Sequence, residues 1–500
     1  MTIYSRLHGL FGERPTDESR RAFLRATAAA GAALLLPACA SGPKSIANKA
    51  SKEKVVVIGA GFAGLCAAYQ LSRAGAGVTV FEARDRIGGR VLTLRDFVPG
   101  KKVEGGGELI GANHPLWLAL AREFDIELTD VSKGEGTRDP IVIDGQKLDF
   151  DRAAELWESM NAALSRMNSL AKDIDSNQPW LSARANELDR KTIDEWIQDL
   201  DVDALTKRAC WVLLSSDNGQ DPSRMSLLAQ LACVKGGGLE KFWTETESYR
   251  TLSGNDLLAR RFADAIGAGR IRLNTPVTSI DTRGAFNTDR RMPTRVFLAN
   301  GEMIECDHIV FATPPPTWAR IAFDPALPPD LLPQTGSNTK YLARVKRRFW
   351  RDDNLSQYAL SDLDVEQTWD GTDGQNAGPE ACLVGFNGGP GSVHTLDWAR
   401  QTRDSNFAGI LERFYPGYKA NFVASRFMGW PHEEWTRCSY SFPAPGEVTS
   451  IGPALARGVG PLHFAGEHCS YAFIGYMEGA LQSGVAAANA IFSPAARAPS

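Results

Sequence analysis

The clearest hydrophobic pattern in the chain begins at residue 55. Four consecutive aliphatic residues, 55–58, predict a strand buried on both faces, because such strands lack the polar alternation of a half-exposed sheet. The apolar spacing of 65–71 predicts a helix directly after it. A second aliphatic run, 78–81, predicts the next strand. The order strand, helix, strand indicates an α/β fold.

Two longer regions show other patterns. In 113–239 the apolar residues follow helical spacing, for example along 156–167, with charged residues between them. In 316–436 the runs 341–346 and 422–427 alternate between apolar and polar residues, which predicts strands. We therefore expect a second domain of helices and a mixed sheet beside the α/β part.

Length and composition narrow the class of protein. A chain of 500 residues is too long for one compact core, so two or three domains are expected. The 55 Lys and Arg residues against 59 Asp and Glu give a net charge of -4, which excludes the basic field that nucleic-acid binding needs. Eight cysteines without a CxxC or Cys/His cluster predict neither a disulfide scaffold nor a metal site.

The N-terminal residues resemble an export signal. The pair Arg20-Arg21 precedes an uncharged run, 26–38, that is too short to span a bilayer, which is the twin-arginine pattern. We expect residues 1–38 to be a signal peptide, 39–52 a linker, and the mature protein to be periplasmic or extracellular. A lipid anchor on Cys39 and cleavage at nearby small residues without lipid both stay open. The alternative is a basic arm followed by an ordinary core helix.

The turn after the first strand carries a dinucleotide-binding fingerprint. In 59–64, Gly59 permits a tight turn, Gly61 leaves room for a pyrophosphate, and Gly64 lets the helix pack on the strand. The second strand ends at Glu82, where a carboxylate accepts hydrogen bonds from an adenosine ribose and disfavours a 2′-phosphate. The fingerprint alone does not choose between NAD and FAD.

The run that follows, 82–90, has the sequence Glu-Ala-Arg-Asp-Arg-Ile-Gly-Gly-Arg and resembles the signature of the flavin amine oxidase family. This family includes monoamine oxidases, polyamine oxidases and L-amino-acid oxidases. The resemblance implies FAD as a resident cofactor and a Rossmann-like domain of the glutathione-reductase type. A carrier that must dissociate at each turnover gains little from so many anchors.

Four later segments resemble the family in the same order along the chain. They are the glycine-rich run 104–111, the strand 272–280, the strand 307–315, and the C-terminal motif 464–480. The fingerprint and the resemblance together assign the following residues to FAD: Gly59, Gly61, Ala63, Gly64, Glu82, Ala83, Arg84, Gly89, Arg90, Gly106, Gly107, Glu108, Leu109, Val277, Trp430, Gly466, Glu467, Tyr476 and Met477. The helix expected near Met477 would direct its positive end at the flavin.

These motifs also divide the chain. The FAD-binding domain is expected to comprise 53–112, 240–315 and 437–492, the substrate-binding domain 113–239 and 316–436, and the tail 493–500. The two domains are therefore predicted to interleave along the sequence.

The resemblance also implies catalytic and substrate-binding residues. Lys340 falls where the family has a lysine that holds a water near flavin N5, and Tyr476 falls in the aromatic substrate cage. Trp430, Leu109 and Ser439 are the other predicted substrate neighbours. Monoamine oxidases have a flavin-linked cysteine followed by tyrosine at the position of Cys438-Ser439. Because the tyrosine is missing and a thiol is commonly a core residue, we expect FAD to bind without a covalent link.

The predicted function is oxidation of an L-amino acid to a 2-oxo acid, ammonia and hydrogen peroxide, with hydride transfer to flavin N5 and molecular oxygen as oxidant. The segment 104–115 resembles bacterial secreted L-amino-acid oxidases, although Leu109 stands where classical members place an arginine for the substrate carboxylate. Arg95 and Arg437 are candidate substitutes. The alternative is a monoamine or polyamine oxidase that yields an aldehyde, and the remaining rivals are an NAD-dependent dehydrogenase, a carotenoid-desaturase-like flavoprotein and a non-catalytic binder. The oligomeric state, a homodimer included, stays open.

Overall fold

The computed structural model describes residues 3–12, 29, 31, 53–132, 138–286 and 293–492. The twin-arginine pair, the linker 39–52, Cys39 and the tail 493–500 lie outside the described residues. Within those ranges no helix is both long and apolar enough to cross a membrane.

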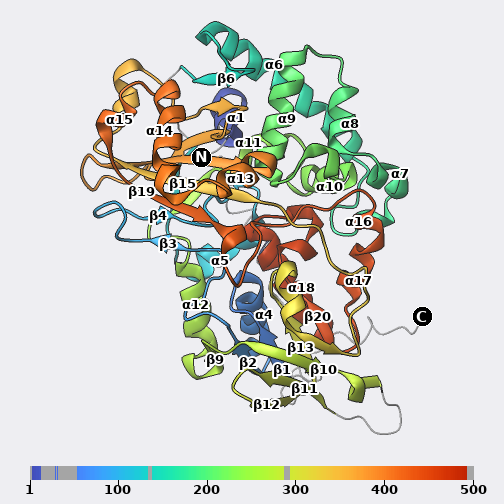
Figure 1. The fold of residues 1–500 in the computed structure, drawn as a ribbon. Coiled ribbons are helices and arrows are strands. Elements are labelled where there is room, and N and C mark those ends of the chain that lie inside the picture. The colour runs from blue at the N-terminus through green and yellow to red at the C-terminus, as the bar shows by residue number, and fades with distance from the viewer. Residues whose placement is uncertain are drawn as a thin grey trace.

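A parallel five-stranded sheet forms the centre of the lower half of the molecule in Figure 1. Its order is β20 (Leu462–Phe464), β13 (His308–Phe311), β1 (Lys54–Ile58), β2 (Gly77–Phe81) and β9 (Ile271–Arg272). The strands predicted at 55–58 and 78–81 are confirmed, and they pair in register from Lys54 with Gly77 to Ile58 with Phe81. The sheet draws its strands from three separate parts of the chain, as the interleaved arrangement requires.

One face of this sheet is covered by helices and the other by a second sheet. The helices are α4 (Phe62–Arg73), α5 (Pro115–Glu123), α12 (Leu257–Ile266) and α18 (Met477–Phe492), and they share one buried apolar cluster with β1 and β2. On the other side lies a four-stranded sheet in the order β12 (Met303–Cys306), β11 (Thr294–Leu298), β10 (Val277–Asp281) and β14 (Ala322–Asp324). Layers on both faces explain why the parallel strands are apolar throughout.

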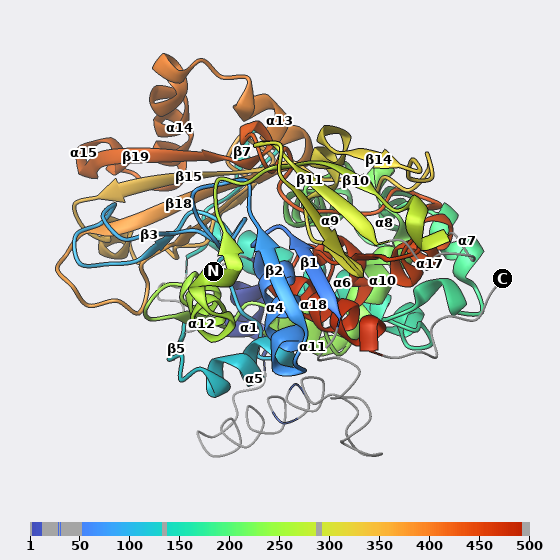
Figure 2. The same cartoon turned by 90° about the horizontal axis from the view of Figure 1, so that it is seen from below.

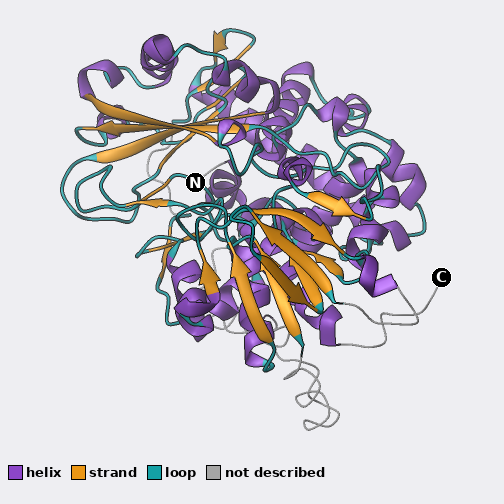
Figure 3. Cartoon of the chain, turned by 60° about the horizontal axis from the view of Figure 1, so that its bottom comes forward, coloured by secondary structure: helices purple, strands orange, loops and turns teal. Residues whose placement is uncertain are grey.

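A mixed seven-stranded sheet lies in the upper part of the molecule, apart from the parallel sheet, as Figure 3 shows. Its order is β19 (Phe422–Gly429), β15 (Asn338–Val345), β18 (Ala381–Gly388), β17 (Gln367–Asp370), β16 (Leu360–Ser361), β6 (Ile141–Ile143) and β7 (Gln146–Lys147). Alternate residues of β15 face different layers: Tyr341 packs on α14 (Arg400–Phe414), whereas Leu342 packs toward Leu109. The strands predicted at 341–346 and 422–427 are confirmed.

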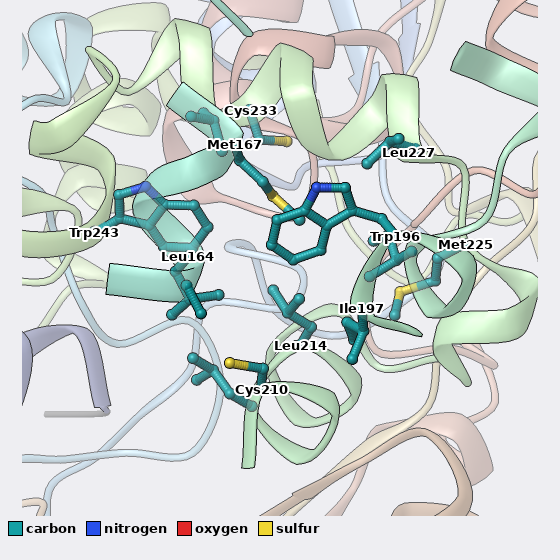
Figure 4. Close-up of a cluster of buried hydrophobic side chains, with 14 of the residues drawn as sticks. Leu164, Met167, Trp196, Ile197, Cys210, Leu214, Met225, Leu227, Cys233 and Trp243 are labelled. Atoms are coloured by element: carbon teal, nitrogen blue, oxygen red, sulfur yellow. The ribbon is translucent and has the colours of Figure 1, made fainter. Parts of the chain in front are cut away.

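Helices form the remaining part of the upper half, to the right of β15 and β19 in the view of Figure 2. Their bounds are α6 (Phe150–Ala171), α7 (Ala185–Arg190), α8 (Ile193–Gln198), α9 (Ala204–Asn218), α10 (Leu227–Gly236) and α11 (Glu240–Glu245). Figure 4 shows their shared core, in which Trp196 and Trp243 lie among Leu164, Met167 and Leu214. The helical spacing of 156–167 is therefore confirmed as the buried face of α6.

The described N-terminal residues form a helix, α1 (Ile3–Phe11), that packs against α11. Leu7 is fully buried in the helical core, and Arg6 Nη2 forms an ion pair with Asp139 Oδ2 at 2.7 Å. This part of the predicted signal peptide thus contacts the substrate-side helices.

The layers depart from the expected boundaries in three places. Helix α5 follows residue 112 yet packs in the cofactor-side core, because Glu478 of α18 accepts the backbone N–H groups of Leu116 and Trp117 at 3.0 and 2.8 Å. Helix α11 follows residue 239 yet packs in the helical core. Strand β14 follows residue 315 yet pairs with β10. The positions of the sequence motifs do not show which layer such a segment joins, because tertiary packing determines it.

The remaining elements connect these layers. They are β3 (Thr93–Leu94), β4 (Val103–Glu104), β5 (Leu128–Asp130), β8 (Tyr249–Thr251), α13 (Gly389–Leu396), α15 (Tyr418–Asn421), α16 (Glu447–Ser450) and α17 (Gly452–Arg457). Strand β3 pairs with β4, and β5 pairs with β8.

Candidate active site and cofactor cavity

One long cavity runs from the carboxyl ends of the parallel strands to the seven-stranded sheet. Its lining combines the β1–α4 turn, residues 106–109 of the glycine-rich run, strand β15 and the C-terminal motif. With the exception of Gly64, the residues assigned to FAD lie on it, as do Lys340 and Ser439, whereas the carboxylate candidates Arg95 and Arg437 do not. The sequence therefore predicted which residues gather in this cavity, while their individual roles stay predictions.

The turn between β1 and α4 opens into this cavity. Gly59 has a φ of 103°, and a Cβ there would lie 2.8 Å from the carbonyl oxygen of Ala312, so only glycine fits. A Cβ on Gly64 would lie 2.0 Å from the Gly59 carbonyl oxygen, which explains its place behind the turn. A Cβ on Gly61 would meet no protein atom closer than 3.9 Å, so the room beside Gly61 is left for a ligand.

The carboxylate of Glu82 is fixed at the end of β2. It accepts the backbone N–H of Ala60 at 2.7 Å and that of Arg84 at 3.0 Å, and the side chain is 5% exposed. Arg84 pairs in turn with Glu433, a residue that the sequence did not single out. The ribose end of the cavity is therefore held in place from two distant parts of the chain.

The C-terminal motif closes the opposite wall. Glu467 accepts hydrogen bonds from Arg90 Nη1 at 2.9 Å and from the backbone N–H of Gly475 at 3.0 Å. Burial opposes ionisation of this carboxyl, but the charge of Arg90 outweighs it and lowers the pKa of Glu467. Helix α18 begins at Met477 on the cavity wall, as predicted, so its positive end faces the cavity.

The glycine-rich run passes directly under Trp430. The indole Nε1 donates to the Gly105 carbonyl at 2.9 Å, and a Cβ on Gly106 would lie 1.9 Å from the Arg90 carbonyl oxygen and 3.1 Å from the indole. A side chain at position 106 would therefore push this run into the cavity. Close packing against Arg90 and Trp430 therefore requires glycine at position 106, whereas a surface loop would not.

Lys340 reaches the cavity because it lies on the same face of β15 as Leu342. Its Nζ donates to Glu108 Oε2 at 2.7 Å and to the Gly106 carbonyl at 2.8 Å, and a longer contact of 3.4 Å reaches the Glu104 carbonyl. The ammonium group is thereby placed beside the glycine-rich run.

Glu108 is the common partner of two cations. Arg250 Nη2 lies 2.6 Å from Glu108 Oε1, and Trp369 Nε1 donates to the same oxygen at 3.0 Å. Burial alone would raise the pKa of Glu108, but the positive charges of Lys340 and Arg250 lower it to about 2. Glu108 therefore stays ionised at neutral pH and holds Lys340 in place. Arg250 was not predicted, and no local motif marks it.

Glu104 differs from Glu108 although only four positions separate them. Its carboxyl accepts from the backbone N–H of Asn255 at 2.9 Å and from Thr93 Oγ1 at 3.0 Å, and no cation pairs with it in the described part of the chain. Burial raises the pKa of Glu104 to about 8. One carboxyl beside the lysine is therefore protonated at neutral pH and the other is ionised.

The substrate end of the cavity is lined by aromatic rings. They belong to Trp369, Phe386, Trp430, Tyr440 and Tyr476. Ser439, which stands where the resemblance places a tyrosine, donates through Oγ to Asn338 Oδ1 at 2.6 Å. The adjacent Tyr440 lines the cavity and donates its hydroxyl to the Asp217 carbonyl at 2.6 Å.

Cys438 and the two arginine candidates do not reach this cavity. Cys438 is buried outside the described lining, and burial raises the pKa of its thiol to about 12, which disfavours the nucleophilic thiolate. Arg95 pairs with Asp256 at 2.6 Å, and Arg437 is also absent from the described lining. Neither arginine is therefore placed to bind a substrate carboxylate.

Two carboxylates of the substrate end were not predicted. Asp217 belongs to the last turn of α9, and Glu247 lies in the turn between α11 and β8. Both come from regions whose sequence shows only helical spacing. The one local signal was Gly219, which ends α9 in the left-handed conformation and so places Asp217 at a helix end.

The residues present fit FAD. Unfilled room beside Gly61, a fixed carboxylate at Glu82, and a helix end at Met477 follow one another along a single cavity. These features match the needs of a pyrophosphate, a ribose and an electron-poor ring system respectively.

Comparison with known proteins agrees with this geometry. The family model described as flavin containing amine oxidoreductase matches residues 62–492. Amine oxidase [flavin-containing] A of Sus scrofa is 28% identical over 461 residues, covering 88% of this chain and 85% of that protein. L-amino acid dehydrogenase of Synechocystis sp. is 26% identical over 474 residues, covering 90% and 97%.

Among solved structures, cyclohexylamine oxidase from Brevibacterium oxydans superposes with a TM-score of 0.78 at 29% identity. The match covers 88% of this chain and 98% of that one. The chain belongs to the family of flavin-containing amine oxidoreductases, enzymes that use FAD and act on amine groups.

Proposed function

We propose that this protein is an amine oxidase that converts an amine to an aldehyde, with release of ammonia or a smaller amine and of hydrogen peroxide. The observation that favours an amine over an amino acid as substrate is that the cations of the described cavity lining already have ion-pair partners. Arg84, Arg90, Arg320 and Lys340 line the cavity, and each forms an ion pair with a glutamate. Within the described lining, a substrate carboxylate would therefore compete with an existing partner for every cation.

When bound, FAD supplies the two-electron acceptor, which molecular oxygen reoxidises to yield hydrogen peroxide. The chain's own residues select and orient the amine. Tyr476, Tyr440 and Trp430 present aromatic surface that favours the uncharged amine over water, because burial disfavours the ammonium form. The neutral amine has the lone pair that its oxidation to an imine requires.

Lys340 is proposed to hold a water molecule beside the flavin. Its two short contacts, to Glu108 and to the Gly106 carbonyl, fix the ammonium group, while the 3.4 Å contact to the Glu104 carbonyl is long enough for a water oxygen to replace it. Water is also the reagent that hydrolyses an imine to the carbonyl product.

A second candidate is oxidation of an L-amino acid, the function first expected from the sequence. Its specific support is the similarity to the Synechocystis L-amino acid dehydrogenase over 90% of this chain. The pairing of the cavity arginines argues against it, because a substrate carboxylate would have to displace a glutamate.

The two candidates differ in product. Purified protein containing FAD is mixed anaerobically with a panel of monoamines, polyamines and L-amino acids while the flavin absorbance is followed, and the product is then identified after oxygen is admitted. Bleaching by amines with aldehyde and peroxide as products supports the proposal. Bleaching by amino acids alone, with a 2-oxo acid as product, would replace it by the second candidate, and no bleaching by any compound would reject both.

A further inference from the structure

The substrate end of the cavity contains two carboxylates that the reaction itself does not use. Asp217 reaches the cavity from α9, and Glu247 reaches it from the turn before β8. The two chain segments come from different layers, so their convergence is a product of the fold.

Each carboxylate is anchored to a segment that carries a predicted active-site residue. The Ser216 carbonyl, one residue before Asp217, accepts from Asn338 Nδ2 at 2.7 Å, and Asn338 is two residues before Lys340 on β15. The Ser248 backbone N–H, one residue after Glu247, donates to the Ile110 carbonyl at 3.0 Å, directly after Leu109. Both carboxylates are thus held at defined positions beside the reaction site.

The two carboxylates and two tyrosines share the same region. Burial first, and then the charges of Asp217 and Glu247, raise the pKa of both Tyr440 and Tyr476. Burial, and then the charge of Asp217, raise the pKa of Glu247, so its ionised form would be favoured when a cation is bound beside it. All four groups line the same cavity, and the Tyr440 hydroxyl donates to the Asp217 carbonyl at 2.6 Å.

The C-terminal end of α9 adds to the negative potential. Helix α9 has 15 residues and ends with Asp217 and Asn218 before Gly219, so the partial negative charge of its carbonyl end lies beside the Asp217 carboxylate. The two acids and this helix end together favour a positive charge at this position.

The other acids of the described lining contact Lys340, Arg90 or the backbone at the ribose end. Glu108 pairs with Lys340 and Arg250, Glu467 pairs with Arg90, and Glu82 accepts backbone N–H groups at the ribose end. Asp217 and Glu247 are the two acids of the described lining that have no such contact to Lys340, Arg90 or the ribose end, and Asp217 Oδ1 accepts a hydrogen bond from Gln367 Nε2 at 2.6 Å.

We infer that Asp217 and Glu247 bind a second positively charged group of the substrate, so that the preferred substrate is a primary amine with a distal ammonium or guanidinium group. This inference rests on the proposed function and specifies its substrate class. The chemistry is shared by α,ω-diamines and by basic L-amino acids, and the absence of an unpaired arginine from the described lining favours the diamine.

The test compares substrates that differ only in the distal charge. Putrescine and cadaverine are matched with butylamine and pentylamine, and L-lysine forms a third arm. We expect the diamines to have a KM about 10- to 100-fold below those of the matched monoamines, the range that a charged hydrogen bond provides. Asp217→Asn and Glu247→Gln should each remove most of this preference, because they should raise the KM of the diamines far more than that of the matched monoamines.

Binding is measured independently of turnover. Calorimetric titration of diamine into protein whose FAD has been photoreduced under nitrogen reports affinity without consumption of the ligand. Glu155→Gln is the matched control, because Glu155 is an exposed acid on α6. Retained flavin absorbance and an unchanged Tm show that each variant is folded.

The outcomes separate the two proposals. If monoamines bleach the flavin but the diamines bind no better, or if the variants weaken both classes equally, the distal-cation inference is wrong while the amine oxidase proposal stands. If L-lysine is preferred over the diamines, the distal site is retained but the substrate is an amino acid. If no amine bleaches the flavin, the proposed function itself fails.

Discussion

The cofactor end of the cavity is built from short stretches of adjacent residues, whereas the substrate end is built from single residues far apart in the sequence. The ribose and pyrophosphate positions come almost entirely from 59–64 and 82–90, where backbone N–H groups and glycines determine the geometry. The substrate end instead combines residues between positions 217 and 476. The difference implies that local sequence specifies the cofactor, while the tertiary fold specifies the substrate.

The largest expected effect comes from removing a cation beneath the substrate end. Arg250→Met leaves the buried Glu108 with Lys340 as its ion-pair partner among the described residues, which should lower the free energy of unfolding by about 3–5 kcal/mol. Urea unfolding measures this change. Replacement of the exposed Arg184, which pairs with Glu187, should have little effect. Equal losses for the two variants would contradict a special role for the Glu108 network.

The next effect concerns the chemistry at the substrate end. Lys340→Met removes the group proposed to hold water, and the rate of anaerobic flavin reduction should fall by about 100- to 1,000-fold while FAD stays bound. Lys346→Met is the control, because Lys346 follows the same strand and donates to an exposed backbone carbonyl. A flavin reduction rate that is unchanged in the Lys340 variant would leave the lysine with a packing role only.

A smaller effect is expected at the cofactor end. Gly61→Ala should be tolerated by the protein, since its Cβ meets no protein atom within 3.9 Å, yet it should weaken FAD binding about tenfold, or by about 1.4 kcal/mol. Gly64→Ala is the contrast, because its Cβ would overlap the Gly59 carbonyl and should also lower the Tm. FAD content and Tm are measured together. A Gly61 variant with normal FAD affinity would refute the assignment of this space to the pyrophosphate.

Another expected effect is a change in pH dependence, measured as a slope instead of as a single loss. The pKa of Glu104 is about 8 in the folded protein against 4.5 as its ordinary value, so between these values the folded state keeps a proton that the unfolded chain has lost. Stability therefore decreases as pH rises through this window, by up to about 1.4 kcal/mol per pH unit. Glu104→Gln should flatten this slope in unfolding measured at several pH values.

Glu366→Gln provides a matched variant for that experiment. Burial also raises the pKa of Glu366 to about 8, but its carboxyl accepts the Gly388 backbone N–H at 2.7 Å, whereas the Glu104 carbonyl lies 3.4 Å from Lys340 Nζ. Both variants should flatten the slope for stability, whereas only Glu104→Gln is expected to change the pH profile of flavin reduction. A steeper slope in either variant would contradict the expected loss of stability with rising pH.

The sequence was sufficient for the cofactor end because its signals are local. Gly59, Gly61 and Glu82 lie within one β-turn-α-β unit, so their spacing reports their geometry directly. Lys340 could be located as well, since it lies within a recognisable segment. The two ion pairs Arg84–Glu433 and Arg250–Glu108 could not be predicted, because each joins residues separated by more than a hundred positions without a motif on one side.

The substrate carboxylates illustrate the limit more clearly. Asp217 and Glu247 belong to helical regions where a charged residue is ordinarily exposed to solvent, and only the packing of α9 against β15 and of the 245–249 turn against 110–112 brings them into the cavity. The preference for an L-amino acid was argued from resemblance alone. It weakened once the arginines of the cavity were seen to have partners.

The interleaved order of segments has a consequence for biosynthesis. The flavin cavity needs the turn at Gly59, directly after the first strand, and the helix end at Met477, more than four hundred residues later. A nascent chain on the ribosome therefore lacks one complete wall of this cavity until Met477 has emerged. Prosthetic-group insertion must then follow translation, and a prematurely terminated product would be a colourless protein.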